Sequence, residues 1–354
     1  MEREIVERAA RLLFNVEWRV WYFGGNAGFW GLEAASTLTG DDSYTCFAYG
    51  LAKAWCARRT PQRKYDQTLP GLECLELARR FSDAQLVEAV IGHAEWLSAH
   101  ERVEGAWLTD DDYPRLIWVD TLSIHPDDDY PRLIWVDTLS IHPPFLAALG
   151  EYKREYYDVA CELLLNHARL LQDDAGLFCH TYNVDTQTTD GVHWGRGQGW
   201  ALMGLLETWK RLPDGFSGRD EIASRFRRCL EALEALQTPE GSWHTVVDDP
   251  ESYTESSTAA FYVIAASQAI THGLIPRKHY TYIKRAWRAV ENSFSGDGRY
   301  LGVSEDTWSG DKQYYRSVPK RSFSTWSQGA ALAAIKEYIA LRGLLNGSGK
   351  ALGE

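Results

Sequence analysis

The sequence predicts an all-α protein whose helices form six hairpins closed into a ring, an (α/α)6 barrel with short β-strands at one end. Segments with helical periodicity alternate along the chain between a charged, amphipathic kind and an apolar kind rich in Gly, Ala and aromatic residues, six of each. A helix that is apolar all round belongs inside a protein, whereas a helix with one charged face belongs outside. We therefore expect six inner helices surrounded by six outer helices.

Each expected helix follows from this alternation, taken in chain order. The amphipathic segments, expected outside, are 2–19, 43–57, 84–101, 154–171, 218–237 and 277–295. The apolar segments, expected inside, are 26–38, 70–81, 143–153, 198–211, 256–271 and 327–341. The pattern predicts one catalytic domain over residues 1–342, followed by a flexible tail over 343–354.

Short phrases of one type lie after the outer segments and account for the expected strands. Each has a small or acidic residue, a glycine and then an aromatic or aliphatic pair, which is typical of a β-turn that leads into a strand; they are 104–108, 174–178, 240–244 and 297–301. If these strands lie at one end of the barrel, the inner helices begin at that end. Helix N-termini favour anions, so this end is where we expect an anionic ligand.

The composition excludes several kinds of protein. Hydrophobic residues make up 45% of the 354 residues and aromatic residues 13%, so the chain can bury a large core. A net charge of −12 argues against nucleic acid or an anionic membrane as a partner. The first residues alternate in charge where a signal peptide would be apolar, and no run is long enough to span a membrane. The six cysteines form no CxxC pair, so we expect a cytoplasmic protein with free thiols, no metal site and no cofactor.

A perfect tandem copy interrupts the third hairpin. Residues 110–126 (DDDYPRLIWVDTLSIHP) are repeated unchanged as residues 127–143. The copy is too short to be a structural repeat, so one of the two is expected to be an extra loop. Asp120 and Asp137 occupy the same place in the two copies. We favour Asp137 as the functional copy, because it leads directly into the apolar segment that begins at residue 143, whereas a charged turn follows the first copy.

The stretch His193–Gly204 (HWGRGQGWALMG) combines polar groups with signals for the start of a helix. We interpret it as a loop that brings Trp194, Arg196 and Trp200 to the mouth of a buried helix. A guanidinium can bind a carboxylate through paired hydrogen bonds, and indole faces can cover a sugar ring, so the cluster suits an anionic sugar. The alternative is that the tryptophans are core residues and Arg196 makes a structural ion pair.

Other polar residues precede inner segments and are candidates for the same site. They are Asp66, Asp137, His180, Glu255, Lys320, Arg321 and Trp326. An Asp before a helix is often only an N-cap, but the apolar neighbours of Asp137 in Ile-Trp-Val-Asp favour the protonated carboxyl that a general acid requires. Glu255, followed by two serines, is better interpreted as a cap. His180 by itself is weakly specific.

With these residues in view, the chain resembles the unsaturated glycuronyl hydrolases, most closely the unsaturated rhamnogalacturonyl hydrolases of glycoside hydrolase family 105, with family 88 next. The motifs that carry the resemblance are Tyr65-Asp66 through Pro70-Gly71, Trp135-Val136-Asp137-Thr138-Leu139, and Trp194-Gly195-Arg196-Gly197-Gln198-Gly199-Trp200. Gln198 is typical of family 88, whereas family 105 often has Asn there. The resemblance extends over nearly the whole chain and implies the (α/α)6 fold.

The resemblance also implies a reaction. The substrate would be an oligosaccharide left by a polysaccharide lyase, with a terminal 4,5-unsaturated uronic acid whose C4=C5 bond is an enol ether. Asp137 would protonate C4 and then activate the water that adds at C5, and Asp66 would hold the sugar and keep Asp137 protonated. His180, Trp194, Arg196 and Trp200 would bind the substrate.

Two alternatives remain open at this stage. The chain could be another six-hairpin sugar enzyme, such as an epimerase or a glucanase, which would need a pair of histidines or a second catalytic carboxylate at the barrel mouth. It could instead be a carbohydrate-binding relic whose site the duplication has inactivated. Such a relic would bind sugar saturably without turnover.

Overall fold

The computed structural model describes residues 1–16, 18, 24–58, 70–99, 102–106, 131–321 and 323–348. The inner helices in these ranges are α2 (Gly25–Thr39), α4 (Gly71–Arg80), α7 (Pro143–Leu149), α9 (Gly195–Arg211), α11 (Ser256–Thr271) and α14 (Thr325–Ser348). The outer helices are α1 (Arg3–Leu12), α3 (Ser43–Arg58), α5 (Ala84–Ser98), α8 (Glu155–Leu171), α10 (Arg219–Ala235) and α12 (Tyr280–Asn292). Short helices α6 (Thr138–Ile141), η2 (Arg277–His279) and α13 (Lys312–Ser317) lie between them.

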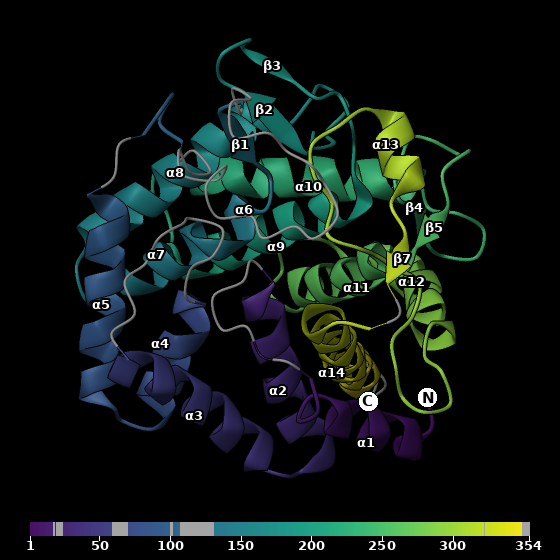
Figure 1. The fold of residues 1–354 in the computed structure, drawn as a ribbon, viewed down its shortest axis with the longest axis horizontal. Helices are drawn as coiled ribbons and strands as arrows, with labels where there is room; N and C mark the ends of the chain where they lie inside the picture. The colour runs from purple at the N-terminus through teal and green to yellow at the C-terminus, as the bar shows by residue number, and fades with distance from the viewer. Residues whose placement is uncertain are drawn as a thin grey trace, which may run out of the picture.

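The inner helices form a closed ring. Each contacts the next along the chain, from α2 through α4, α7, α9 and α11 to α14, and α14 packs against α2. In Figure 1 the colours run once around this ring, so that the yellow α14 lies beside the purple α2. The predicted (α/α)6 barrel is confirmed. Among the described residues, no helix is long and apolar enough to cross a membrane.

Glycines set how closely the inner helices approach one another. A Cβ on Gly31 of α2 would lie 2.3 Å from the Cα of Gly329 on α14, and a Cβ on Gly199 of α9 would lie 2.7 Å from Phe261 on α11. These contacts leave no room for a side chain. The helix expected over 198–211 begins three residues earlier, at Gly195, so the loop expected to precede it ends at Trp194. The glycines of 193–204 allow close helix packing, and α9 begins among them.

The glycine-containing turns that follow the outer helices pack against the next outer helix around the ring. Gly176, Gly241 and Gly298 have φ values of 97°, 91° and 90°, which glycine adopts without strain. A Cβ at these positions would meet the backbone of α10, α12 and α1 respectively. Each of these segments is thus a turn that packs against the following outer helix. The turn at Gly298 packs against α1 and so closes the outer ring of helices.

The strands are shorter than the glycine-containing segments suggested, and most of them begin after those segments. Isolated bridges such as Gln172 to Phe178 and Phe294 to Tyr300 close the turns. The strands are β1 (Leu133–Trp135), β2 (Thr181–Asn183), β3 (Thr188–Thr189), β4 (Trp243–His244), β5 (Thr254–Glu255), β6 (Val303–Ser304) and β7 (Lys320–Arg321). They form antiparallel sheets in the orders β1-β2-β3, β4-β5 and β6-β7. Trp194 directly precedes α9 and β5 directly precedes α11, so these segments lie where inner helices begin.

Some predicted boundaries differ from the structure. The helix expected over 2–19 ends at Leu12, and the helix expected over 143–153 ends at Leu149, one residue before Gly150. The tail expected from 343 begins inside α14, which continues to Ser348. The six-residue helix α13 was not expected, because its segment is too short to show periodicity.

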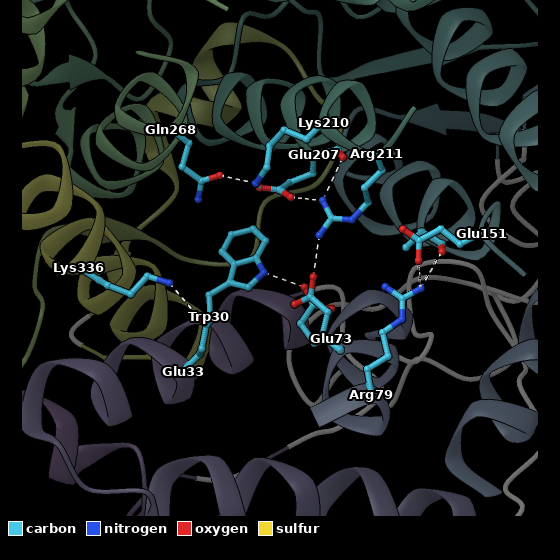
Figure 2. A network of polar contacts seen from close by, with 12 residues as sticks. Trp30, Glu33, Glu73, Arg79, Glu151, Glu207, Lys210, Arg211, Gln268 and Lys336 are labelled. Atoms are coloured by element: carbon cyan, nitrogen blue, oxygen red, sulfur yellow. Dashed lines mark hydrogen bonds and ion pairs between the residues drawn. The ribbon is translucent and has the colours of Figure 1, made fainter. Parts of the chain in front are cut away.

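The end of the barrel at which α9 and α11 finish carries a network of charged side chains around a cavity of about 300 Å³ (Figure 2). Glu207 on α9 binds both Lys210 and Arg211, and Arg211 also reaches Glu76 on α4 at 2.7 Å. Burial disfavours the ionised form of Glu207, but the two cations outweigh it and hold its pKa at about 2. Ion pairs therefore link α4 and α9 at this end of the barrel.

Glu73 on α4 lies in the same cavity lining and forms no ion pair with any residue that the structure describes. Its carboxylate accepts a hydrogen bond from Trp30 Nε1 at 2.7 Å, and the residue is 8% exposed. Burial, followed by the charge of Glu76, raises the pKa of Glu73 to about 7. The folded protein therefore holds this proton more tightly than the unfolded chain does. The stability from Glu73 is present in full below about pH 4.5 and is lost as the pH rises through 7.

We predict that Glu73→Gln stabilises the protein increasingly as the pH rises from 5 to 8. The amide keeps an oxygen for Trp30 and removes the buried charge. Relative to wild type, the variant should gain on the order of 2–3 kcal/mol between these two pH values. Urea unfolding of both proteins at each pH measures this difference.

The matched control is Glu151→Gln, since the Glu151 side chain is 66% exposed in its ion pair with Arg79. Its effect should change by less than about 0.5 kcal/mol over the same range. A Glu73→Gln effect that does not vary with pH would contradict the assignment.

Candidate active site

The pairing of β1 with β2 brings Asp137 beside His180. Trp135 lies opposite Thr181, and the amide of Val136 donates to the carbonyl of His180 at 3.0 Å. Asp137 is the residue after Val136, and His180 is the residue before β2. As a result, Nε2 of His180 lies 3.4 Å from Oδ2 of Asp137.

Asp137 is held by the start of α6, yet its side chain remains accessible. A Cβ on Gly204 of α9 would lie 2.1 Å from the carbonyl oxygen of Leu139, so α6 and α9 touch at the backbone. The Asp137 side chain is 14% exposed. It makes no capping hydrogen bond to the helix that it precedes. The N-cap interpretation is therefore wrong for Asp137, and its carboxyl is available for chemistry.

His180 is buried among aromatic rings. Its imidazole lies edge-on to Trp135 with ring centroids 4.8 Å apart, and 4.3 Å from the ring of Trp194. Its Nδ1 lies 2.6 Å from the hydroxyl of Tyr315, which in turn donates to Asp190 at 3.1 Å. His180 is 1% exposed, and its Nε2 faces Asp137. It is thus placed to orient the Asp137 carboxyl.

Arg196 lies in the core beside this site. Its guanidinium is stacked between Trp194 and Trp326, at 4.3 and 4.4 Å from the ring centroids. It donates to the carbonyls of Ser304 and Glu305, each at 2.7 Å. The side chain has no exposed surface. These contacts fix the backbone after β6, so the geometry indicates a positioning role.

The two predicted tryptophans are also buried. Trp194 is 1% exposed, and Trp200 is fully buried against Trp30, Phe261 and Trp326. In this structure neither ring has a face open to a ligand. Their expected stacking on a sugar stays a prediction. Trp194 supports His180, and Trp200 packs among the inner helices. The alternative that these residues belong to the core describes their surroundings better.

Other sequence predictions have different outcomes. Asp66 and Asp120 lie outside the described residues, as does the whole of the first copy of the duplicated segment. Glu255 is confirmed as a helix cap: it is fully buried and accepts from the amide of Thr258 at 3.1 Å. It also accepts from the amide of Ser304 at 3.1 Å, which ties α11 to the segment that Arg196 holds.

Three residues of the site were missed by sequence reasoning. Tyr315 and Asp190 complete the hydrogen bonds that lead from His180, and Trp308 packs edge-on against Trp135 with centroids 5.9 Å apart. Residues 305–315 (EDTWSGDKQYY) lie between the last outer and inner helices and combine aromatic with polar residues. That composition in a connecting segment was the signal that could have located Tyr315 and Trp308.

His193 fixes the segment just before Trp194. Its two ring nitrogens lie 3.1 Å from Asp173 and 3.2 Å from Asp248. Burial opposes the charge on His193, but hydrogen bonding to Asp248 outweighs it and raises its pKa to about 10. The resulting ion triad is structural. Among the described residues, no group of three or more His, Cys, Asp or Glu side chains is arranged to hold a metal ion.

Comparison with known families identifies the chain. The family model described as Glycosyl Hydrolase Family 88 matches residues 2–342. The chain belongs to glycosyl hydrolase family 88. It is 24% identical over 351 residues to the unsaturated rhamnogalacturonyl hydrolase YesR of Bacillus subtilis, a match that covers 95% of this chain and 94% of that protein. The resemblance inferred from the motifs is therefore confirmed.

Solved structures of this family's fold agree with the ring described above. A possible member of the GH105 family from Salmonella enterica superposes with a TM-score of 0.82 at 21% identity, covering 97% of this chain and 95% of that one. An unsaturated glucuronyl hydrolase from Bacillus sp. GL1 superposes with a TM-score of 0.70 at 17% identity, covering 95% and 96%. The likeness to these structures is one of fold.

We predict that Arg196→Ala destabilises this family 88 enzyme. The substitution removes two stacking contacts and leaves buried carbonyls without a donor, which should cost about 3–5 kcal/mol and lower Tm by roughly 5 °C. The control is Arg169→Ala, whose side chain is 53% exposed in its ion pair with Glu221 and should lower Tm by about 1 °C or less. An unchanged Tm together with a large rise in KM would instead restore the predicted direct contact with substrate.

Proposed function

We propose that this glycoside hydrolase removes a terminal 4,5-unsaturated uronic acid from oligosaccharides produced by polysaccharide lyases. The observation that carries the proposal is the placement of Asp137. Its carboxyl lies at the start of α6, makes no capping hydrogen bond, is partly exposed and faces His180. The full-length similarity to an unsaturated rhamnogalacturonyl hydrolase supports this class of substrate.

The first chemical step is protonation of the sugar. The ring oxygen of an unsaturated uronic acid makes C4=C5 an enol ether, so C4 is nucleophilic. Asp137 in its acid form donates a proton to C4, and the ring oxygen stabilises the positive charge that develops at C5. Because the ring oxygen of the sugar itself stabilises this charge, the protein has to supply one well-placed acid for this step.

The second step is addition of water. The Asp137 carboxylate left by the first step takes a proton from a water molecule as that water bonds to C5. The product is a hemiketal at C5, which opens and releases the aglycone from C1. One carboxyl thus serves as acid and then as base, in contrast to the two flanking carboxylates of ordinary glycoside hydrolysis.

Binding of the sugar is assigned to the groups around Asp137. Trp135 and Trp308 are both partly exposed and pack edge-on against each other, and Trp135 also contacts His180, so these two rings are proposed to bind the sugar. Arg196, Trp194 and Trp326 act indirectly, by fixing β6 and the residues after it. Asp66 is proposed as the second carboxylate of the site, on the basis of its motif.

The test of this function follows the C4=C5 double bond optically. Incubation with lyase-generated oligosaccharides from pectin, ulvan and glycosaminoglycans should abolish the ultraviolet absorbance of the conjugated uronate and release the aglycone. Saturated glycosides of the same sugars should remain intact. Hydrolysis of the saturated compounds without loss of absorbance would assign the chain to a different reaction.

We predict that Asp137→Asn lowers kcat by a factor on the order of 10³ or more and leaves KM within about threefold of wild type, since the amide keeps the shape of the side chain but carries no acidic proton. Asp120→Asn, in the other copy of the duplicated segment, is the matched control and should retain most of the activity. Initial rates at several substrate concentrations separate kcat from KM. If Asp120→Asn is inactive and Asp137→Asn is active, the first copy carries the acid.

A further inference from the structure

A chain of polar groups leads from Asp137 into the protein, in which the contact between Asp137 and His180 is within ion-pair distance and is not a hydrogen bond. His180 Nε2 faces Asp137 at 3.4 Å, His180 Nδ1 lies 2.6 Å from the Tyr315 hydroxyl, and that hydroxyl lies 3.1 Å from Asp190 Oδ2. Asp137 lies just before α6, His180 just before β2, Tyr315 in α13 and Asp190 just after β3. His180 and Tyr315 are separated by 135 positions along the chain. The contact is therefore made by the tertiary fold.

The direction of each hydrogen bond follows from the end of this chain. An ionised Asp190 can only accept, so the single hydroxyl proton of Tyr315 is directed to it. Burial, followed by the charge of Asp190, raises the pKa of Tyr315, which keeps that proton in place. The Tyr315 oxygen then has only lone pairs to offer His180, so Nδ1 of His180 must carry a proton and donate it.

We propose that Tyr315 and Asp190 are positioning residues that fix His180 as the Nδ1–H tautomer, so that its unprotonated Nε2 faces Asp137. A neutral imidazole in this tautomer offers no donor to the Asp137 carboxylate. Its Nε2 offers only a lone pair, which can accept from the acid form of Asp137. This inference rests on the proposed function for its effect on catalysis, because the first step requires that acid.

The fold supports this chain by clamping α13. Lys312 lies 3.1 Å from Asp248, and Arg316 binds Asp249 through two hydrogen bonds of 2.7 and 2.9 Å. Both carboxylates belong to one segment between β4 and β5. A helix of six residues has little stability of its own, so these pairs hold Tyr315 in place.

Few ionisable groups surround His180 among the described residues. Asp137 and Tyr315 face its two nitrogens, and Asp190 lies behind Tyr315. Trp135 and Trp194 cover the ring, and the guanidinium of Arg196 lies beyond Trp194. The tautomer is therefore determined by Tyr315 and Asp190 on one side and by Asp137 on the other.

Two substitutions should reverse the tautomer. Tyr315→Phe removes the acceptor at Nδ1, so His180 adopts the Nε2–H form and donates to the Asp137 carboxylate. Asp190→Asn presents an amide donor to the Tyr315 oxygen, which turns the hydroxyl proton toward His180 with the same result. Both changes place a donor, in place of a lone pair, against the Asp137 carboxyl. We expect kcat near pH 7 to fall by about 10- to 100-fold, KM to change by less than about threefold, and the alkaline limb of the pH profile to move to lower pH by about one unit.

The direct readout is the nitrogen NMR spectrum of the full-length protein with ¹⁵N-labelled histidine and no substrate. The chain has 10 histidines, and the signals that disappear in His180→Gln identify His180. Wild type should show a protonated Nδ1 and a bare Nε2 near pH 7, and Tyr315→Phe and Asp190→Asn should each show the reverse. Tyr314→Phe is the control in the same helix, since the Tyr314 hydroxyl binds the amide of Trp308; it should keep the wild-type tautomer.

The outcomes separate this inference from the proposed function. An Nε2–H tautomer or a doubly protonated His180 in wild type would overturn the inference, whatever the substrate proves to be. An unchanged pH profile in both variants, with turnover intact, would overturn the assigned effect on Asp137. Failure of wild type to act on any unsaturated oligosaccharide would count against the proposed function and leave the NMR result standing.

Discussion

The site depends on one stacked cation in the core. Arg196 lies between Trp194 and Trp326, and its hydrogen bonds fix the segment after β6. Trp194 in turn supports His180, which faces Asp137. A buried charge is tolerated here because two carbonyl oxygens, two hydroxyls and two π faces replace its hydration. The same side chain therefore joins α9, α14 and the strand end, and through Trp194 and His180 it supports the position of Asp137.

The fold could be predicted from the sequence because its signal is repeated and local. Whether a helix such as α11 is apolar all round can be determined from its own residues, and six repetitions leave little doubt about which ring each helix joins. The glycines around Arg196 could not be interpreted in the same way. Gly199 is required by Phe261, 62 positions away, and the sequence alone does not indicate which helix packs against it.

The site was predictable where a motif carried it and unpredictable where the fold assembled it. Asp137 and His180 were found from motif and resemblance, and the β1–β2 register brings them together. Tyr315 and Asp190 belong to connecting segments with no periodicity, and their contacts to His180 and to each other exist only after the ring has closed. Residue type alone suggested that Arg196 binds a substrate carboxylate, whereas its exposure depends on packing that the sequence does not display.

Closure of the ring by α14 has a consequence for synthesis of the protein. The apolar face of α2 packs against α14, the last described helix to leave the ribosome, and Gly31 and Gly329 meet across that seam. Until α14 is made, the first inner helix has its closest neighbour missing, and an apolar surface stays exposed during translation. Such long-range closure slows folding and makes the nascent chain prone to aggregate. Production of active enzyme therefore depends on how the cell protects that exposed helix during translation.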